Sequence, residues 1–191
     1  MDIREKLFNF RSYTPIPLFV ALVWLAEPKV WSMAIGMACC VLGEVVRVWA
    51  VRHAGGATRT TRGVGGDVLV TTGPYAYVRN PLYLGNFLNL MGLSVAAWAW
   101  MPWMVLLALL LFAAQYGLII SLEQEYLGTR FGERYALYRS HVPAVIPRLS
   151  AWASGSPAAV DPLSRALRTE RSTFGTLALM FLLLVLRWKV C

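Results

Sequence analysis

Histidine and acidic residues are scarce in this chain, and their scarcity limits the chemistry it can hold. Of 191 residues, 2 are histidine and 10 are Asp or Glu. His53 and His141 have no second His or Cys at ligand spacing, so the sequence predicts no metal site. The G-x-S-x-G motif is also missing, which argues against a Ser/His/Asp hydrolase.

Cysteine is equally sparse. Cys39 and Cys40 are neighbours in an apolar run and Cys191 is the last residue, so no disulfide framework is expected. Cys191 does not form a C-a-a-X prenylation box, and the mixed charge of residues 1–11 does not resemble a signal peptide. A glycine-rich stretch at residues 55–66 lacks the third glycine of the dinucleotide fingerprint, because Val68 stands there. We interpret this stretch as a loop near lipid headgroups.

Apolar residues are in excess. They make up 58% of the chain, and the mean hydropathy is +0.54; an ordinary soluble domain is roughly 45–50% apolar. The excess is gathered in runs at residues 15–26, 31–51, 82–100, 102–122 and 172–186. Since about 20 apolar residues cross a bilayer core as helix, we predict one all-α integral membrane domain over residues 1–191, with about five transmembrane helices. Whether 15–26 and 172–188 cross fully stays open.

The two middle runs predict a helical hairpin. Only Met101 separates them, and Trp98, Trp100 and Trp103 gather around that point. Tryptophan favours the interface between membrane and water, so the tip of the hairpin is expected there.

The net charge of +8 predicts the orientation. With five spans, most Lys and Arg residues fall on the side of the N-terminus. By the positive-inside rule, we expect a multi-pass protein whose N-terminus and loops 51–80 and 123–171 are cytoplasmic. The same rule accounts for the charge without nucleic acid, which is not an expected partner; membrane lipids are. The oligomeric state stays open.

Some charged residues stand inside or beside the apolar runs. Glu44 and Arg47 are three apart and can pair on one helix face. Two interpretations remain open for them, a functional site in the membrane or snorkelling to the interface. Glu123 follows a charge-free helix, whose dipole disfavours an anion at that end, and Arg79 is expected nearby to compensate.

Three sequence features together carry a resemblance to a known family. They are the segment GPYAYVRNPLYLG at residues 73–85, the hairpin that ends at Glu123, and the segment FGERYALY at residues 131–138. In order and spacing they resemble the isoprenylcysteine carboxyl methyltransferase and phospholipid methyltransferase superfamily, over residues 69–148. Residues 150–161 are interpreted as a linker to the last apolar helix, at about 172–188.

The resemblance implies an integral membrane enzyme that transfers a methyl group from S-adenosylmethionine (AdoMet) to a lipophilic acceptor entering from the bilayer. It places the cofactor in a cytoplasm-facing pocket between the hairpin and the C-terminal segment. Our hypothesis for the catalytic residues is that Arg79 orients the acceptor and that Glu123 binds the amino-acid end of AdoMet. The cofactor contacts fall on Asp67, Val68, Leu69, Val70, Tyr75, Asn80, Pro81, Leu82, Tyr83 and Glu123.

Three departures from the family pattern bear on function. Asn80 replaces the more common histidine and cannot act as a base. Gln124 replaces the second glutamate of a Glu-Glu pair, so only Glu123 inherits that role. Ile119 stands where the prenylcysteine enzymes have an arginine for the substrate carboxylate. The acceptor is therefore left open among a prenylcysteine-like carboxylate, a phospholipid amine and another lipid, with O, N or S as nucleophile.

Two alternatives are kept. Membrane sterol reductases share a related C-terminal arrangement and use NADPH. A non-enzymatic carrier or scaffold would show polar residues at mid-bilayer, for which the hairpin offers Asn86, Asn89 and Gln115.

Overall fold

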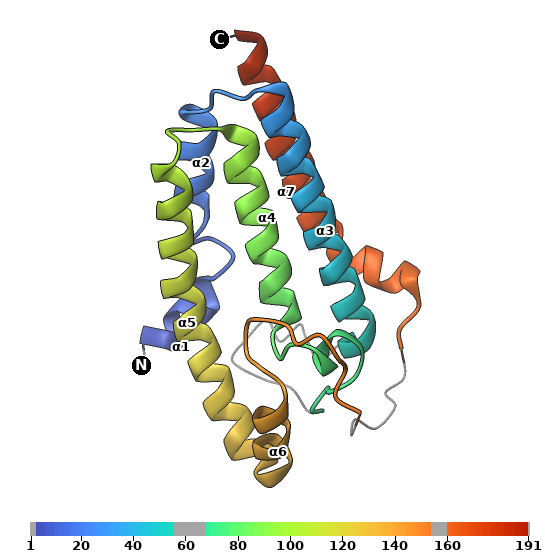
Figure 1. Cartoon of the computed structure of the whole chain (residues 1–191). Coiled ribbons are helices and arrows are strands. Elements are labelled where there is room, and N and C mark those ends of the chain that lie inside the picture. The colour runs from blue at the N-terminus through green and yellow to red at the C-terminus, as the bar shows by residue number, and fades with distance from the viewer. Residues whose placement is uncertain (1–2, 56–67, 154–159, 191) are drawn as a thin grey trace.

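The structure, a computed structural model, describes residues 3–55, 68–153 and 160–190. Over these residues the regular elements are all helical, which confirms the predicted all-α class. They are α1 (Ile3–Phe10), α2 (Ile16–Trp24), α3 (Val30–Ala54), the 3-10 helix η2 (Gly73–Ala76), α4 (Pro81–Ala97), α5 (Trp103–Phe131), α6 (Glu133–His141) and α7 (Leu163–Val190). Figure 1 shows the long helices side by side, with η2 and α6 at the end of the bundle that we call the α6 end.

Three helices are long and apolar enough to cross a membrane, judged by length and composition: Val30–Ala54, Trp103–Phe131 and Leu163–Lys189. The third predicted span corresponds to α4, which has 17 residues. The first corresponds to α2, which has nine and is about 14 Å long. The expected count of about five spans therefore stays a prediction, whereas three candidate spans are supported.

The predicted hairpin is present. Pro81 opens α4 at a position where a missing N–H costs nothing, and α4 ends before Trp98, whose φ of 50° is left-handed. Trp31 of α3 packs edge-on against Trp98, with ring centroids 4.4 Å apart. The tip of the hairpin is thus aromatic, and its place at the interface between membrane and water stays a prediction.

The second hairpin helix is longer than its apolar run. α5 continues past residue 122 to Phe131 and stops at Gly132, whose φ of 53° ends the helix. The polarity after residue 122 marks the end of the apolar stretch and not the end of the helix. Glu123 therefore lies more than two turns inside α5, and the premise that it sits at a helix C-terminus was wrong.

Close packing joins α3 to α4. A Cβ placed on Gly36 would lie 2.4 Å from the carbonyl oxygen of Gly92, closer than any real contact. Small residues at facing positions let two helix backbones approach in this way. The contact fixes how the polar residues of α3 and α4 face each other further along the bundle.

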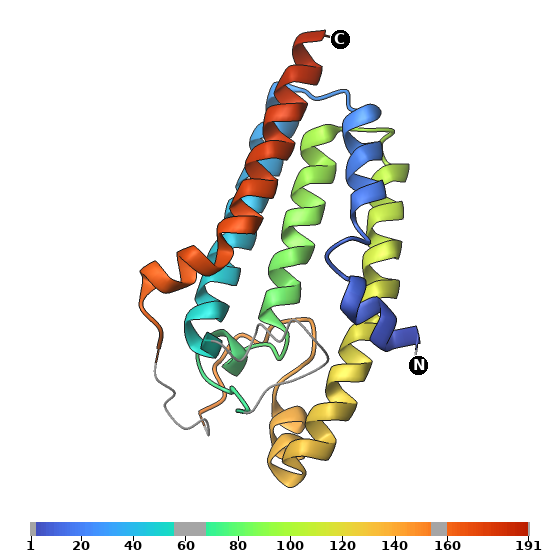
Figure 2. The same ribbon diagram turned by 180° about the vertical axis from the view of Figure 1, so that it is seen from behind.

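The last helix begins earlier than its apolar run. α7 starts at Leu163, and its first turns run across the direction of the remainder (Figures 1 and 2). Asp161 fixes this start, because its N–H donates to the Arg52 carbonyl over 2.7 Å. The arrangement carries Glu170 into the bundle, where it is 2% exposed.

At the α6 end, the chain after α6 returns to the start of the hairpin. Tyr135, Tyr138 and Val142 form a small buried cluster, so the aromatic face of α6 packs inside the protein. The Arg79 N–H donates to the Pro143 carbonyl over 2.9 Å, and the Trp152 N–H donates to the Ala76 carbonyl over 3.0 Å. The segment that follows α6 is thereby joined to η2 and to the start of α4.

Candidate functional site

A cavity of about 700 Å³ runs from the α6 end into the bundle. Along α4 its lining extends from Pro81 to Leu93, a rise of about 18 Å. The deep end is apolar, with Leu90, Leu93 and Phe112 among its walls. The α6 end is polar and aromatic, as expected for a small-molecule site with a few convergent polar groups.

The predicted site residues meet on this cavity. Those that line it are Val68, Leu69, Val70, Tyr75, Arg79, Asn80, Pro81, Leu82, Tyr83 and Glu123. Asp67 lies outside the described residues. The structure thus brings together segments 68–70, 75–83 and 123, although their roles remain predictions.

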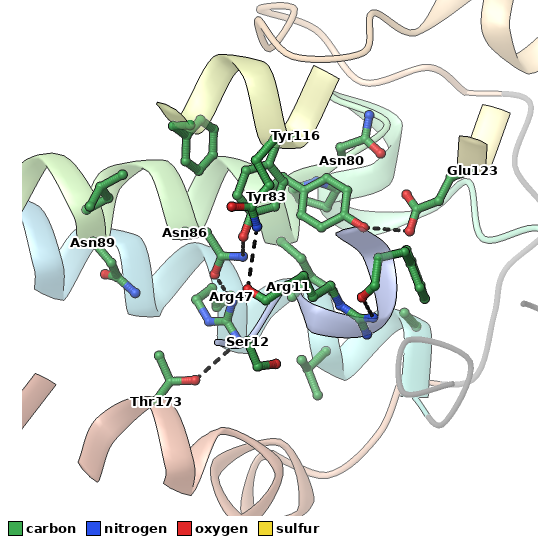
Figure 3. Close-up of a pocket in the computed structure, with 18 of the residues that line it drawn as sticks. Arg11, Ser12, Arg47, Asn80, Tyr83, Asn86, Asn89, Tyr116, Glu123 and Thr173 are labelled. Atoms are coloured by element: carbon green, nitrogen blue, oxygen red, sulfur yellow. Dashed lines mark hydrogen bonds between the residues drawn. The ribbon is translucent and has the colours of Figure 1, made fainter. Parts of the chain in front are cut away.

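Glu123 is bound by Tyr83. The Tyr83 O–H donates to Glu123 Oε1 over 2.5 Å (Figure 3), a charge-assisted bond across the hairpin. Tyr116 lies beside Tyr83, with ring centroids 4.7 Å apart, so a second aromatic ring packs against the one that holds the carboxylate. A carboxylate with aromatic rings in the same cavity suits a positively charged ligand.

Arg79 does not pair with Glu123, contrary to the compensation expected from the sequence. Its Nη1 donates to the Tyr135 hydroxyl over 3.2 Å, because α6 folds back against this end of the cavity. The Nε of Arg79 is buried and has no partner among the described residues. Arg79 lines the cavity, and this Nε is an unsatisfied donor in its interior-facing part.

The tyrosines at the α6 end are hydrogen-bond donors. Burial raises the pKa of Tyr75 and of Tyr138 above the usual value for a phenol. The Tyr138 O–H donates to the Tyr75 carbonyl over 2.7 Å, which fixes α6 against η2. Both phenols are neutral near pH 7, so they shape and polarise the site without acting as bases there.

The side chain of Asn80 forms a structural hydrogen bond. Its Nδ2 donates to the Ala144 carbonyl over 2.8 Å, and the residue still lines the cavity. The amide that replaces the more common histidine therefore ties the hairpin to the segment after α6, which a sequence comparison alone does not reveal.

The main feature that sequence reasoning missed is a polar cluster deeper in the bundle, the interior cluster. Its members are Glu44, Arg47, Asn86, Asn89, Glu170 and Thr173. Arg47 pairs with Glu170 at 2.5 Å and also hydrogen-bonds to Asn86, which in turn donates to Tyr116 over 2.8 Å. Asn89 donates to Glu44 over 2.6 Å.

The interior cluster excludes one of the two interpretations of Glu44 and Arg47. The side chain of Arg47 is 13% exposed and that of Glu44 is 9% exposed, with 3.6 Å between Arg47 Nε and Glu44 Oε1. Both point into the bundle, so the snorkelling interpretation was wrong. The charge on α3 was visible in the sequence, whereas Glu170 was assigned to a loop because it precedes the apolar run.

In the described part of the chain, no three His, Cys, Asp or Glu residues lie close enough together to hold a metal ion. Each histidine packs against tryptophan instead. His53 Nδ1 lies 3.0 Å from the Trp49 carbonyl oxygen, and the His141 ring stacks on Trp152 with centroids 5.5 Å apart.

The sequence profile of the phospholipid methyltransferase family matches residues 31–134. This range includes Arg79, Tyr83, Glu123 and the interior cluster members of α3 and α4. It excludes the N-terminal segment that holds Arg11, most of α6, and α7.

Three curated proteins illustrate the similarity. The protein-S-isoprenylcysteine O-methyltransferase of Schizosaccharomyces pombe is 34% identical over 119 residues, which is 61% of this chain and 49% of that protein. The protein of the same name from Tribolium castaneum is 30% identical over 133 residues, or 64% and 44% of the two chains. The cobalt-zinc-cadmium resistance protein CzcN of Cupriavidus metallidurans is 34% identical over 120 residues, or 63% and 51%. The chain thus spans about half the length of the curated relatives it matches.

Proposed function

Because this chain belongs to the phospholipid methyltransferase family, we propose that it transfers a methyl group from AdoMet to a lipophilic acceptor in the membrane. The observation that carries the proposal is the Tyr83–Glu123 pair on the cavity wall. Two residues 40 positions apart, both within the family match, there form one binding surface for a small cation.

The residues present fit AdoMet. A cavity of about 700 Å³ is of the size that holds a cofactor. The Glu123 carboxylate suits the ammonium of the amino-acid end, and the rings of Tyr83 and Tyr116 suit a sulfonium. When bound, AdoMet would supply a methyl group activated by its positive sulfur.

Each part of the cavity has its own task in this proposal. Glu123 binds the cofactor, and Tyr83 positions the carboxylate through its hydrogen bond. Arg79 orients the reacting group of the acceptor, since it is a cation that lines the polar end of the cavity. Leu90, Leu93 and Phe112 at the deep end hold the apolar tail and exclude water. Displacement at a methyl group needs mainly this alignment of the two reactants.

The decisive experiment compares Glu123→Gln with Glu125→Gln. Glu125 lies two positions further on α5, but its side chain is 65% exposed and pairs with Arg4, so it is a matched control. Calorimetric titration of the purified protein with AdoMet should show affinity at least about tenfold weaker for Glu123→Gln, because a charge-assisted contact contributes about 1.5–3 kcal/mol. Glu125→Gln should bind like the unmodified protein. Equal affinity in both variants would remove Glu123 from the site.

A thermal-shift comparison separates this function from the NADPH-dependent alternative. AdoMet and its demethylated product should each raise the unfolding temperature, because a ligand that binds the native state stabilises it. NADPH should leave the temperature unchanged. Transfer of radiolabelled methyl from AdoMet into a total membrane lipid extract would then identify the acceptor.

A further inference from the structure

The N-terminal segment forms part of the cavity wall although it lies outside the family match. Phe8, Arg11, Ser12, Thr14 and Pro15 all line the cavity, beside residues of α4 and α5. Figure 3 shows Arg11 in the same pocket as Tyr83 and Glu123. This wall is therefore supplied by a part of the chain that the family profile does not cover.

Arg11 is held in place before any ligand binds. Its Nη1 donates to the Phe8 carbonyl over 2.7 Å, and its guanidinium lies 4.0 Å from the Phe8 ring centroid. The Thr14 hydroxyl and Gln115 Oε1 of α5 are hydrogen-bonded at 2.8 Å. Gln115 Nε2 also donates to the Arg11 carbonyl over 3.4 Å. The side chain is thus preorganised by Phe8 and the backbone beside it is tied to α5, which lowers the entropic cost of binding a partner.

Arg11 and Arg47 differ in their electrostatic state. Arg47 is neutralised by Glu170, with Glu44 close by. Arg11 takes part in none of the ion pairs of the described residues, which join Arg4, Arg47 and Arg165 to acids. The guanidinium of Arg11 is partly buried and forms no salt bridge with a described residue, although the Glu123 carboxylate in the same cavity acts on it electrostatically. With five N–H donors, it is complementary to an anion that enters the cavity.

We propose that Arg11 binds an anionic group, phosphate or carboxylate, of the amphiphilic acceptor, and so determines which lipids this enzyme accepts. The segment that follows Arg11 also supplies an apolar surface for the tail of the acceptor, because Leu18 and Phe19 line the cavity about two turns further along the chain. An anionic group at Arg11 would place the attached chain along α2 toward the deep end. This inference rests on the proposed function, since it assigns a site to the acceptor of that reaction.

The test uses three amphiphiles with the same twelve-carbon chain: dodecyl phosphate, dodecanoate and dodecanol. Each is titrated into the full-length protein in nonionic detergent, at a low mole fraction that keeps the micelle charge constant, and the apparent Kd is measured from the thermal shift. Arg11→Gln, Arg11→Lys and Lys6→Gln are compared. Lys6 lies on α1, is exposed and does not line the cavity, so Lys6→Gln removes the same charge from the same segment.

We expect an anionic amphiphile to bind the unmodified protein and Lys6→Gln about tenfold more tightly than it binds Arg11→Gln. The affinity of Arg11→Lys should lie between these two values. The affinity for dodecanol should be the same in all variants. The better of dodecyl phosphate and dodecanoate distinguishes a phosphate-bearing acceptor from a carboxylate-bearing one. Equal binding of anions to Arg11→Gln and to the unmodified protein would overturn the inference, as would the absence of any preference for anions over dodecanol.

AdoMet titration of the same variants separates this inference from the proposed function. If the unmodified protein does not bind AdoMet, the proposed function fails whatever the anions do. If Arg11→Gln loses AdoMet affinity but keeps its response to anions, Arg11 serves the cofactor and the inference is wrong.

Discussion

At the scale of single residues, environment separates side chains of the same type. Glu123 and Glu125 both follow the apolar stretch of α5, but one receives the Tyr83 hydroxyl on the cavity wall and the other faces solvent beside Arg4. Two positions on a helix differ by about 200° around its axis. The contrast makes Glu125→Gln the natural control for Glu123→Gln.

Glu170 gives a prediction at the same scale. Glu170→Ala leaves the buried Arg47 guanidinium without its main partner, and removing one member of a buried ion pair costs about 3–5 kcal/mol. We expect a large drop in unfolding temperature in detergent, whereas Glu133→Ala on the exposed face of α6 should change it little. Similar unfolding temperatures for the two variants would show that the interior cluster contributes little to stability.

At the scale of elements, the contact between α3 and α4 aligns the bundle. The backbones meet at Gly36 and Gly92, and about two helical turns further along α3 Glu44 accepts a hydrogen bond from Asn89 across the same interface. Any change in the approach of these helices would move the interior cluster and one wall of the cavity together.

Gly36→Ala tests this contact. The added methyl would lie 2.4 Å from the Gly92 carbonyl oxygen, so the helices must move apart, at a cost of about 1–3 kcal/mol. Gly117→Ala on α5 meets nothing within 4 Å and should be neutral or stabilising by up to about 1 kcal/mol, because alanine is the better helix former. Thermal unfolding of the two variants in detergent measures the difference. Opposite signs are expected, and a neutral Gly36→Ala would contradict the close approach.

At the scale of the whole molecule, a helical bundle surrounds a cavity that is polar at one end and apolar at the other. Such a cavity can hold a water-soluble cofactor and a lipid tail at once. The three helices long enough to cross a bilayer support an integral membrane protein. In Figure 1 the α6 end and the C-terminus lie at opposite ends of the bundle.

The predicted orientation can be tested on the whole protein. Single cysteines at Lys6, Arg134 and Lys189, in a background with Cys39, Cys40 and Cys191 replaced by alanine, report the side of the membrane. In intact cells, a membrane-impermeant maleimide should label only the variant at Lys189, because the positive-inside rule places the other two in the cytoplasm. Labelling of Lys6→Cys in intact cells would reverse the orientation.

The sequence by itself determined the helices and much of the site. Apolar runs of near-bilayer length fixed the all-α class and the hairpin, because no other local structure satisfies the backbone in lipid. The pattern from Gly73 to Gly85, together with Glu123 and the family resemblance, selected residues that the structure places on one cavity. Local composition is sufficient for the helices and the hairpin, since these depend on residues close together in the chain, whereas the site residues needed the resemblance.

Only the tertiary structure decided which side chains meet. Arg79 bonds to Tyr135 and not to Glu123, because α5 continues to Phe131 and α6 folds back there. Glu170 reaches Arg47 across 123 positions, because α7 begins before its apolar run. The N-terminal segment brings Arg11 to the cavity through its contacts with Gln115. Pairings of this kind depend on how helices pack against one another. The order of polar and apolar residues along the chain does not determine that packing.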